Sequence, residues 1–324
     1  MTTQIRFHET GGPEVLKLET VDLGPPGPGE ARVRHSAVGV NFIDTYHRTG
    51  LYKMPLPSGI GKEAAGLVEA VGDGVTAVKP GDRVVYCDGP LGSYASERNV
   101  PAGVLVKLPQ WVSEQHIAAG FLRAMTVEYL LNRTFKCKAG DTILFHAAAG
   151  GVGLIASQWA RALGVTMIGT VGSDEKGKLA LEHGCSHVIN YRTENFVERV
   201  KEITGGKKVP VVYDSIGKDT WPASLDCLQP LGLMVSFGNS SGPVTGVDLG
   251  ILGPKGSLYV TRQTLMTYTA NRATLEEMAN NVFNLMKDGK LDLAARQTYS
   301  LADAAQAHRD LEARKTVGGV ILVP

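Results

Sequence analysis

Residues Gly140–Leu163 read GDTILFHAAAGGVGLIASQWARAL, and this stretch decides the fold of the chain. A short apolar run, Thr142–Phe145, passes through small residues and three glycines into a helical pattern that ends at Gly164. Glycines let the backbone approach a phosphate closely, and the start of a helix offers unpaired N–H groups and a positive dipole end to an anion. The stretch therefore predicts a strand, a phosphate-binding turn and a helix.

The dinucleotide fingerprint G-x-G-x-x-G fits this turn with an alanine in its first position. The residues concerned are Ala148, Ala149, Gly150, Gly151, Val152 and Gly153. Such a match is weak by itself, because a glycine-rich turn can also serve only tight helix packing. Its place after a strand, at the opening of a helix and at the head of a strand–helix series favours dinucleotide binding.

The end of the next strand indicates which dinucleotide is bound. In an NAD site an acid about 20 residues past the glycines binds the ribose 2′-hydroxyl. Counting along the expected strand Thr166–Val171, the position of this acid corresponds to Gly172 or Ser173, and neither residue is a carboxylate. Ser173 and Lys176 suit a 2′-phosphate, so NADP(H) is favoured. Asp174 either caps the following helix and points away, which we favour, or repels the phosphate.

Regular alternation follows and predicts a doubly wound parallel sheet. The expected strands are 142–145, 166–171, 187–190, 209–213 and 233–237, with helices near 174–183, 195–203 and residue 225 between them. Right-handed crossovers would place the C-terminal ends of these strands along one cofactor edge.

The first hundred residues differ, because they are rich in turns and in short alternating runs. Strands are expected at 16–20, 31–40, 66–71 and 83–86, which together make a small antiparallel unit. Toward the C-terminus we expect an edge strand at 257–260, helices at 273–286 and 302–311, and a last strand at 320–323. This end is too short for a domain, so we expect it to complete the N-terminal unit.

Net charge, the lengths of apolar runs and the spacing of the cysteines exclude several classes of function. The net charge of the 324 residues is +1, so bulk charge implies neither nucleic acid nor an anionic membrane as partner. No apolar run approaches the ~20 residues that span a bilayer, and no signal peptide is visible, so we expect a soluble cytoplasmic protein. The four cysteines lie far apart and form no C-x-x-C pair, hence neither a compact zinc site nor a disulfide framework is expected.

Several motifs together resemble the NADPH-dependent quinone oxidoreductases of the medium-chain dehydrogenase/reductase superfamily, the group that includes zeta-crystallin. They are AAGGVG, GVNFIDTYHRTGLY, GKEAAGLVEAVGDGV, KPGDRV and VSFGNSSG, and the resemblance covers nearly the whole chain. It implies an α/β protein with a GroES-like β-rich catalytic domain, residues 1–122 and 262–324, and a Rossmann domain, residues 123–261. The cofactor would bind in the cleft between them.

The chain departs from the zinc alcohol dehydrogenases of the same superfamily. Their catalytic zinc ligands, a cysteine and a histidine, align with Asn41 and Lys62. Asparagine is a poor zinc ligand and a protonated lysine is none. The four clustered cysteines of their structural zinc are also missing. We therefore expect no metal, and without this Lewis acid the chemistry favours acceptors that take a hydride readily, above all quinones.

The resemblance also assigns roles to individual residues. It places the turn residues Ala149–Gly153 at the pyrophosphate, and Ser173, Lys176, Tyr191 and Arg314 at the 2′-phosphate. It places Asn41, Thr126, Ser215, Gly217, Phe237, Gly238 and Asn239 along the rest of the cofactor, and Asn41, Tyr46, Tyr52 and Arg262 where the reaction occurs.

Ordinary structural roles stand beside these assignments. Lys176 can be a solvated helix charge, and Tyr191 can pack on the sheet. Tyr46 and Tyr52 can be core aromatics, and Arg262 can protect a sheet edge from aggregation. Lys62 either pairs with Glu63 or a neighbouring acid and fills the former metal site, which we favour, or stabilises a reduced quinone.

The sequence thus predicts a zinc-independent NADPH:quinone oxidoreductase. Its protein groups would position the acceptor and stabilise developing negative charge. One alternative is an NADPH-dependent reductase of activated alkenes such as enones. Another, of a different class, is a cofactor-binding structural or RNA-associated protein. The family further implies a homodimer joined through the edge strand at 257–260.

Overall fold

The computed structural model describes residues 1–324 and divides into two compact units. Unit 1 consists of Met1–Leu122, Asn271–Phe283 and Leu293–Pro324, and unit 2 of Arg123–Ala270 and Asn284–Asp292. Each unit has a hydrophobic core of its own. The expected division began the C-terminal part of the first domain at residue 262, whereas residues 262–270 pack with unit 2.

Unit 1 contains two sheets. Its strands are β1 (Thr2–Phe7), β2 (Lys17–Val21), β3 (Glu30–Gly39), β4 (Ser58–Gly59), β5 (Glu63–Val71), β6 (Arg83–Tyr86), β7 (Glu97–Pro101), β8 (Val106–Lys107), β15 (Ala295–Ser300) and β16 (Gly319–Val323). The larger sheet has the order β15-β16-β3-β5-β6-β8 with β7 also paired to β3, and the smaller one has the order β2-β1-β4.

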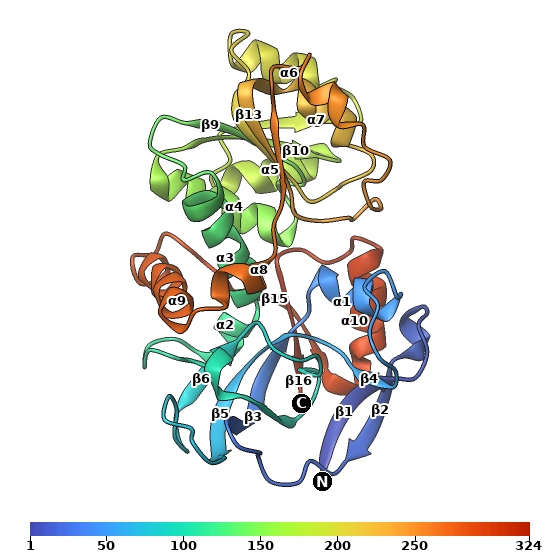
Figure 1. Ribbon diagram of the computed structural model, residues 1–324, viewed down its shortest axis with the longest axis vertical. Coiled ribbons are helices and arrows are strands. Elements are labelled where there is room, and N and C mark those ends of the chain that lie inside the picture. Colours follow the sequence, from blue (N-terminus) through green and yellow to red (C-terminus); the bar gives the residue numbers. More distant parts are fainter. The chain divides into compact units, whose positions relative to one another are not determined.

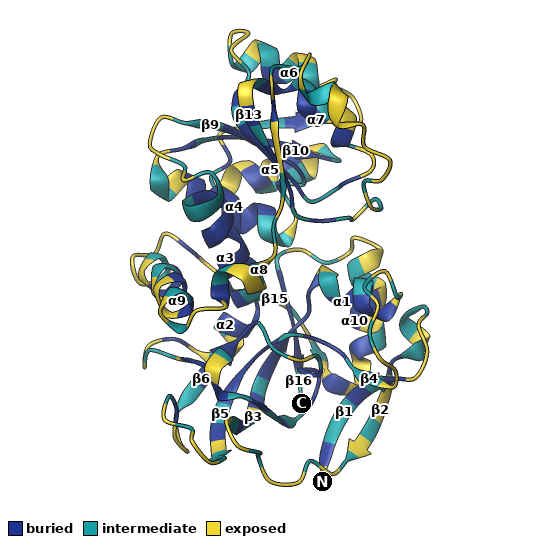
Figure 2. Cartoon of the chain, in the orientation of Figure 1, coloured by how far each residue is buried: buried dark blue, intermediate teal, exposed yellow.

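The long strand β3 organises unit 1. It pairs antiparallel with β5 and β7, and its end pairs with β16, where Leu322 lies opposite Val38. This last pairing confirms that the C-terminal segment completes the N-terminal β unit. Figure 2 shows the paired ends of β3 and β5 buried; along the first half of β3 buried residues alternate with more exposed ones, as in an antiparallel strand with one face toward the core.

Short helices cover the sheets of unit 1. They are α1 (Phe42–Arg48), α2 (Glu114–Ala118), α9 (Arg272–Lys287, its first twelve residues in this unit) and α10 (Ala304–Glu312), with 3₁₀ turns η1 (Pro13–Val15), η2 (Ala102–Val104) and η5 (Leu301–Asp303). Figure 1 shows α1 and α10 side by side, and a hydrogen bond between Arg48 and His308 joins them.

Unit 2 is built on a single six-stranded parallel sheet. Its strands are β9 (Thr142–Phe145), β10 (Thr166–Val171), β11 (His187–Asn190), β12 (Val209–Asp214), β13 (Leu228–Ser236) and β14 (Tyr259–Arg262). Its order, β11-β10-β9-β12-β13-β14, is that of a doubly wound dinucleotide-binding sheet. The fold class predicted from the alternation is confirmed.

Between β9 and β14 the helices of unit 2 alternate with the strands of this sheet, while two helices precede β9 and one follows β14 (Figure 1). They are α3 (Phe121–Glu128, from its third residue), η3 (Tyr129–Thr134), α4 (Gly151–Leu163), α5 (Asp174–Glu182), α6 (Phe196–Ile203), α7 (Trp221–Asp226), η4 (Leu249–Leu252) and α8 (Leu265–Thr269). Helix α4 ends at Gly164 in the left-handed conformation (φ +73°), which a glycine adopts without steric cost.

The edge strand differs from its expected position by two residues. It was expected at 257–260 but runs over Tyr259–Arg262, because Ser257 takes a positive φ of 56° that ends any extended run. Arg262 is therefore the last residue of the strand and does not follow it. Its pairing with Ser236 on β13 fixes the side chain against the loop that follows β13.

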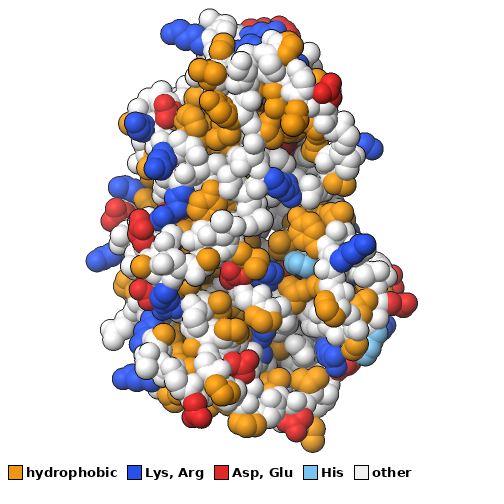
Figure 3. Space-filling view, viewed as in Figure 1, with side chains coloured by type: hydrophobic (Ala, Val, Ile, Leu, Met, Phe, Trp, Pro, Cys, Tyr) orange, Lys and Arg blue, Asp and Glu red, His pale blue; other side chains and the backbone are white.

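The surface carries no concentration of one charge on the face drawn in Figure 3, where lysine and arginine side chains are interspersed with acidic ones. This distribution agrees with a net charge of +1. No helix combines the length and apolar character that crossing a bilayer requires.

Candidate functional site

The strand order of unit 2 reverses between β9 and β12, and ligands of such sheets bind outside the strand ends at this point. The glycine turn lies directly after β9. Gly150 is the N-cap of α4 in an extended conformation, and the first helical bond joins Leu154 N–H to Gly150 O at 2.9 Å. The N–H groups of the first turn therefore face the open end of the helix, as a pyrophosphate site requires.

The glycines of the turn serve different purposes. A Cβ on Gly153 would lie 2.6 Å from both Cα and C of Ala148 and would also meet Ala147 O, so this residue permits close packing of α4 on the turn that follows β9. A Cβ on Gly150 would come no nearer than 3.1 Å to a neighbour, Ala147 O. Packing alone therefore does not explain Gly150, which leaves space at the helix end.

Arg123 of α3 lies beside this turn, and the sequence did not reveal this neighbour. A Cβ on Gly151 would collide with its guanidinium, so the charged group lies against the first residue of α4. Its side chain is largely buried, with 8% of the residue exposed. A cation beside a helix N-terminus strengthens the attraction for a phosphate group.

Three predicted residues meet at the end of β10. Ser173 is the N-cap of α5 and accepts the Lys176 N–H at 3.4 Å. The Tyr191 hydroxyl lies over Gly172, where a Cβ would be 2.7 Å from it, and the residue is 46% exposed. The structure thus groups a hydroxyl, a lysine and a tyrosine at this strand end.

The expected cap role of Asp174 is wrong. Ser173 occupies the N-cap, and Asp174 is the first residue inside α5. Its Oδ1 accepts the side-chain amide of Asn190 at 2.8 Å. Ser173 is the N-cap because its backbone is extended, with φ −163°, which lets its hydroxyl accept a hydrogen bond from a backbone N–H of the first helical turn.

The loop after β12 is shaped by a buried carboxylate. Asp214 is 1% exposed, and its Oδ1 accepts the N–H groups of Ile216 (2.7 Å) and Gly217 (3.1 Å). Its Oδ2 accepts the Thr220 hydroxyl at 2.7 Å. These bonds hold the predicted residues Ser215 and Gly217 in one conformation at the strand end.

The loop after β13 packs directly on the loop after β12. A Cβ on Gly238 would lie 2.8 Å from Ser215 Cα, and Ser240 N–H donates to Ser215 O at 3.1 Å. The ring of Phe237 packs on Phe145 of β9, with centroids 5.6 Å apart. The structure thus brings the predicted residues of both loops together.

Arg262 binds this second loop. Its Nη1 donates to Ser236 Oγ at 3.1 Å and to Gly238 O at 3.0 Å. With the Asn239 amide turned to satisfy both of its ends, the amide oxygen accepts Arg262 Nη2 at 3.0 Å. Arg262 therefore orients Gly238 and Asn239. Thr126 belongs to α3 of the same unit and is 9% exposed.

In unit 1, Asn41 lies between the end of β3 and the start of α1. The pairing of Gly39 with Glu63 brings Glu63 beside it, and Asn41 Nδ2 donates to Glu63 Oε2 at 2.6 Å. The other oxygen of Glu63 accepts Leu122 N–H at 2.7 Å. Asn41 Oδ1 is buried and has no hydrogen-bond partner within the chain, so it can accept a hydrogen bond from a bound molecule.

Helix α1 starts with a capping box that the sequence analysis did not use. Only the half of the box made by the N3 side chain is formed: Asp44 Oδ2 accepts the Asn41 N–H at 2.8 Å, whereas Asp44 N–H donates to the backbone oxygen of Asn41 at 3.0 Å and not to its side chain. The spacing N-x-x-D in NFID signals this arrangement and could have predicted α1. Burial raises the pKa of Asp44 to about 7, against the opposing effects of Asn41 N–H, Tyr94 and Lys62.

Aromatic side chains gather on α1 and the turn after it. Tyr46 packs edge-on against Tyr52 with centroids 5.3 Å apart, and Phe42 packs on Tyr46 at 5.5 Å. His47 packs against Tyr52 at 5.7 Å, and burial, with Lys62 nearby, lowers its pKa to about 4. Both predicted tyrosines thus lie in one half-buried aromatic group.

Lys62 forms the ion pair that we favoured for it, with a neighbouring acid. Its Nζ lies 3.6 Å from Asp88 Oδ1, and both side chains are mostly buried, with 14% and 17% exposed. No group of three or more His, Cys, Asp and Glu side chains is arranged to hold a metal ion. Arg314, expected at the 2′-phosphate, is exposed in unit 1 beyond the end of α10, with a positive φ of 58°.

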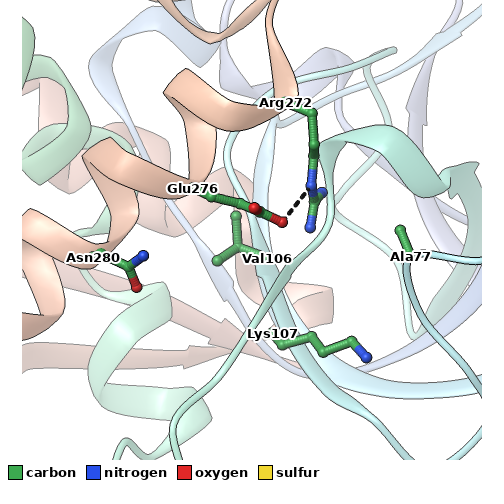
Figure 4. Close-up of a pocket in the computed structure, with 6 residues that line it drawn as sticks. All are labelled: Ala77, Val106, Lys107, Arg272, Glu276 and Asn280. Carbon is green, nitrogen blue, oxygen red and sulfur yellow. Dashed lines mark hydrogen bonds and ion pairs between the residues drawn. The ribbon is translucent and has the colours of Figure 1, made fainter.

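A surface pocket of about 380 Å³ lies elsewhere in unit 1 (Figure 4). It is lined by Ala77, Val106, Lys107, Arg272, Glu276 and Asn280. Its charges are mutually neutralised, since Arg272 bonds Glu276 at 2.7 Å and Lys107 bonds Asp82 at 2.9 Å. None of the predicted site residues lines it, so we do not assign it to the reaction.

A doubly wound sheet with a glycine turn, together with a GroES-like β unit, defines a medium-chain dehydrogenase/reductase. Two family descriptions match accordingly: "zinc-binding dehydrogenase" over residues 151–284, and "alcohol dehydrogenase GroES-like domain" over residues 27–110.

Full-length relatives specify the family further. A quinone oxidoreductase of Salmonella typhimurium is 57% identical over 329 residues, covering 100% of both chains. The crystal structure of Escherichia coli quinone oxidoreductase complexed with NADPH is 55% identical and has a TM-score of 0.98, covering 99% of this chain and 100% of that one. A 2-haloacrylate reductase of a Burkholderia species is 47% identical, covering 98% of both chains. The chain belongs to the quinone oxidoreductases of the medium-chain dehydrogenase/reductase superfamily.

Proposed function

We propose that the protein is a cytoplasmic NADPH:quinone oxidoreductase that works without zinc. The observation that carries the proposal is the 57% identity to a quinone oxidoreductase over the whole length of both chains. An oxidoreductase of this family needs a site for the dinucleotide and a place for the acceptor. The chain's own residues offer groups for both.

The residues present fit NADPH. The helix start at Gly150–Gly151, with Arg123 beside it, offers N–H groups and positive charge to the pyrophosphate. Ser173, Lys176 and Tyr191 offer two hydroxyls and a cation at the end of β10, where NAD enzymes carry an acid. The relative from Escherichia coli was solved as a complex with NADPH.

The nicotinamide supplies the hydride, and the protein supplies orientation and charge. Arg262 holds Gly238 and Asn239, and Asp214 holds Ser215 and Gly217, so that two rigid loops are available to position the ring. Asn41 offers a buried, unpartnered oxygen that can accept an amide N–H. Tyr46 and Tyr52 offer flat apolar surface and hydroxyl groups to an acceptor.

Zinc independence is supported by the contacts of Asn41 and Lys62, the two residues that align with the zinc ligands of the related alcohol dehydrogenases. The amide of Asn41 already donates to Glu63, and Lys62 is paired with Asp88. Neither side chain offers the neutral imidazole or thiolate that zinc prefers. A quinone needs no Lewis acid of this kind, because the reduced oxygen is stabilised by its aromatic ring and by hydrogen-bond donors.

Lys176→Ala is expected to raise the dissociation constant for NADPH about tenfold and to leave that for NADH nearly unchanged. A charge-assisted hydrogen bond contributes ~1.5–3 kcal/mol, and 1.4 kcal/mol equals a factor of ten. Quenching or enhancement of nicotinamide fluorescence measures both constants. Lys178→Ala is the matched control, since Lys178 lies on the exposed side of the same helix. Equal effects on the two nucleotides would refute the 2′-phosphate role.

A reductase of activated alkenes is the second candidate, favoured by the 47% identity to the 2-haloacrylate reductase. Assays of 1,4-benzoquinone and of an enone, each with NADPH under matched conditions, separate the two functions. We expect kcat/KM to be at least tenfold higher for the quinone. Higher kcat/KM for the enone would replace the first proposal by the second.

We also propose a homodimer joined through β14. Its outer edge has no strand beside it, and Tyr259 and Val260 are exposed on it. Two such edges can pair and extend the sheet across both subunits. Light scattering should give about twice the chain mass of 34.5 kDa, and a monomer mass would end the proposal. The proposed function includes no nucleic-acid partner.

A further inference from the structure

Four ionisable side chains form a buried hydrogen-bonded row in unit 1 that the proposed function does not use. They are Asp44 and Arg48 of α1, Tyr94 before β7 and His308 of α10, and none is more than 1% exposed. Removing such groups from water costs several kcal/mol unless each is paired, so apolar side chains at these four positions would avoid this cost. The presence of four such groups in one buried row therefore calls for a specific role.

The hydrogen bonds of the row run in one direction. Arg48 Nη1 lies 2.9 Å from His308 Nδ1, and a guanidinium can only donate, so this ring nitrogen carries no proton. His308 Nε2–H then donates to Tyr94 Oη at 3.1 Å, and Tyr94 donates to Asp44 Oδ2 at 2.9 Å. The ring stays neutral, because burial, with Arg48 beside it, lowers the pKa of His308 to about 3.

The row ends at Asn41. The same oxygen of Asp44 that accepts the Tyr94 hydroxyl also accepts the backbone N–H of Asn41, at 2.8 Å. Asn41 in turn donates to Glu63 and keeps Oδ1 buried and unpartnered. At the other end Arg48 is anchored by Glu312 at 2.6 Å and by Gly11 O at 3.0 Å. Segments distant in sequence thus converge on the residue that starts α1.

We propose that Tyr94, His308 and Arg48 are positioning residues that hold the Asp44 carboxylate against the N–H of Asn41, so that Asn41 presents its free oxygen to the nicotinamide in one orientation. The proposal rests on the proposed NADPH-dependent function. None of the three residues is required to touch the cofactor or the acceptor. They act through Asp44 alone, and an Asp44 that lost its charge would bind the Asn41 N–H less strongly.

The charges around Asp44 determine how this arrangement depends on pH. Lys62 and the donors Asn41 N–H and Tyr94 favour the carboxylate, while burial disfavours it and raises the pKa of Asp44 to about 7. Arg48, Glu63, His47 and His308 complete the surroundings, and both histidines are neutral there because their pKa values are lowered to about 4 and about 3. Loss of the Tyr94 hydroxyl removes a donor to the carboxylate, so Asp44 would protonate at higher pH.

Tyr94→Phe tests the proposal because it deletes only the hydroxyl. We expect kcat/KM with NADPH and benzoquinone to be about tenfold below the wild-type value at pH 6 and within twofold of it at pH 9. This corresponds to an inflection displaced upward by about one pH unit, a factor of ten in the protonation equilibrium. The dissociation constant for NADPH should follow the same pattern, measured by fluorescence without acceptor. A packing defect would lower both quantities equally at every pH.

Tyr299→Phe is the matched control, since the Tyr299 hydroxyl also donates to a carboxylate, Asp310, at 2.9 Å and belongs to the same unit. Its ratio to wild type should not vary with pH. If thermal melting shows Tyr94→Phe unfolded, His308→Gln and His308→Leu replace it: glutamine can accept from Arg48 and donate to Tyr94, whereas leucine can do neither. The glutamine variant should keep the wild-type profile and the leucine variant should shift it.

A folded Tyr94→Phe with a pH-independent ratio overturns the inference, and so does a leucine variant that behaves like the glutamine variant. Failure of the proposed function gives a different result, because the wild type itself would then reduce benzoquinone poorly with NADPH at every pH. The pH dependence of NADPH binding would still report on the row in that case.

Discussion

Gly153→Ala is expected to raise the dissociation constant for NADPH at least a hundredfold and to lower the thermal midpoint of the protein. The new Cβ would lie 2.6 Å from Cα and C of Ala148 and would also meet Ala147 O. These are backbone atoms of the turn and cannot rotate away, so the turn or the start of α4 must shift. The N–H groups of the helix start then lose their alignment with the pyrophosphate. Fluorescence titration and thermal melting measure the two effects.

Gly150→Ala separates cofactor approach from packing in the same turn. Its Cβ would be 3.1 Å from Ala147 O, which a shift of a few tenths of an ångström relieves. We expect a midpoint within a few degrees of wild type but weaker NADPH binding, because the methyl group would occupy space at the helix end. If Gly153→Ala bound NADPH like the wild type, close packing of the turn would not be what the site requires.

The strand, turn and helix of the candidate cofactor site were predictable because their signals are local. Hydrophobic periodicity and glycine placement define β9, the turn and α4 within 24 residues, and the absence of an acid at Gly172 and Ser173 can be read directly. The edge strand was misplaced by two residues, since nothing in the local pattern indicates the positive φ of Ser257. Tertiary context decides such boundaries.

The surroundings of the candidate catalytic residue Asn41 were less predictable because the contacts there are not local. Tyr94 and His308 are separated by 214 residues in the sequence, yet their side chains form a hydrogen bond with each other next to α1. No periodicity links them, and a histidine inside a helix is ordinarily a packing residue. Only the capping spacing of Asn41 and Asp44 was available in the sequence, and it was not used. Arg123 escaped notice for a similar reason, since only the folded turn brings it to Gly151.

The two loops that we propose to position the nicotinamide depend on a single carboxylate, that of Asp214, which the sequence indicated only as the end of a strand. Asp214 is 1% exposed and accepts three hydrogen bonds, from Ile216 N–H, Gly217 N–H and the Thr220 hydroxyl. The loop after β13 packs in turn on Ser215. Disturbing Asp214 should therefore affect both loops at once.

Asp214→Ala is expected to destabilise unit 2 by about 4 kcal/mol and to weaken NADPH binding, because two backbone N–H groups and a hydroxyl lose their acceptor in a buried place. The thermal midpoint should fall by roughly 10 °C. Asp214→Asn retains one acceptor oxygen for the two N–H groups and should lose about half as much. Asp219→Ala removes an exposed carboxylate from the same loop and should melt like the wild type. An Asp214→Ala variant that melts and binds NADPH like the control would show that the loop keeps its shape without the carboxylate, and the positioning role of Asp214 would be wrong.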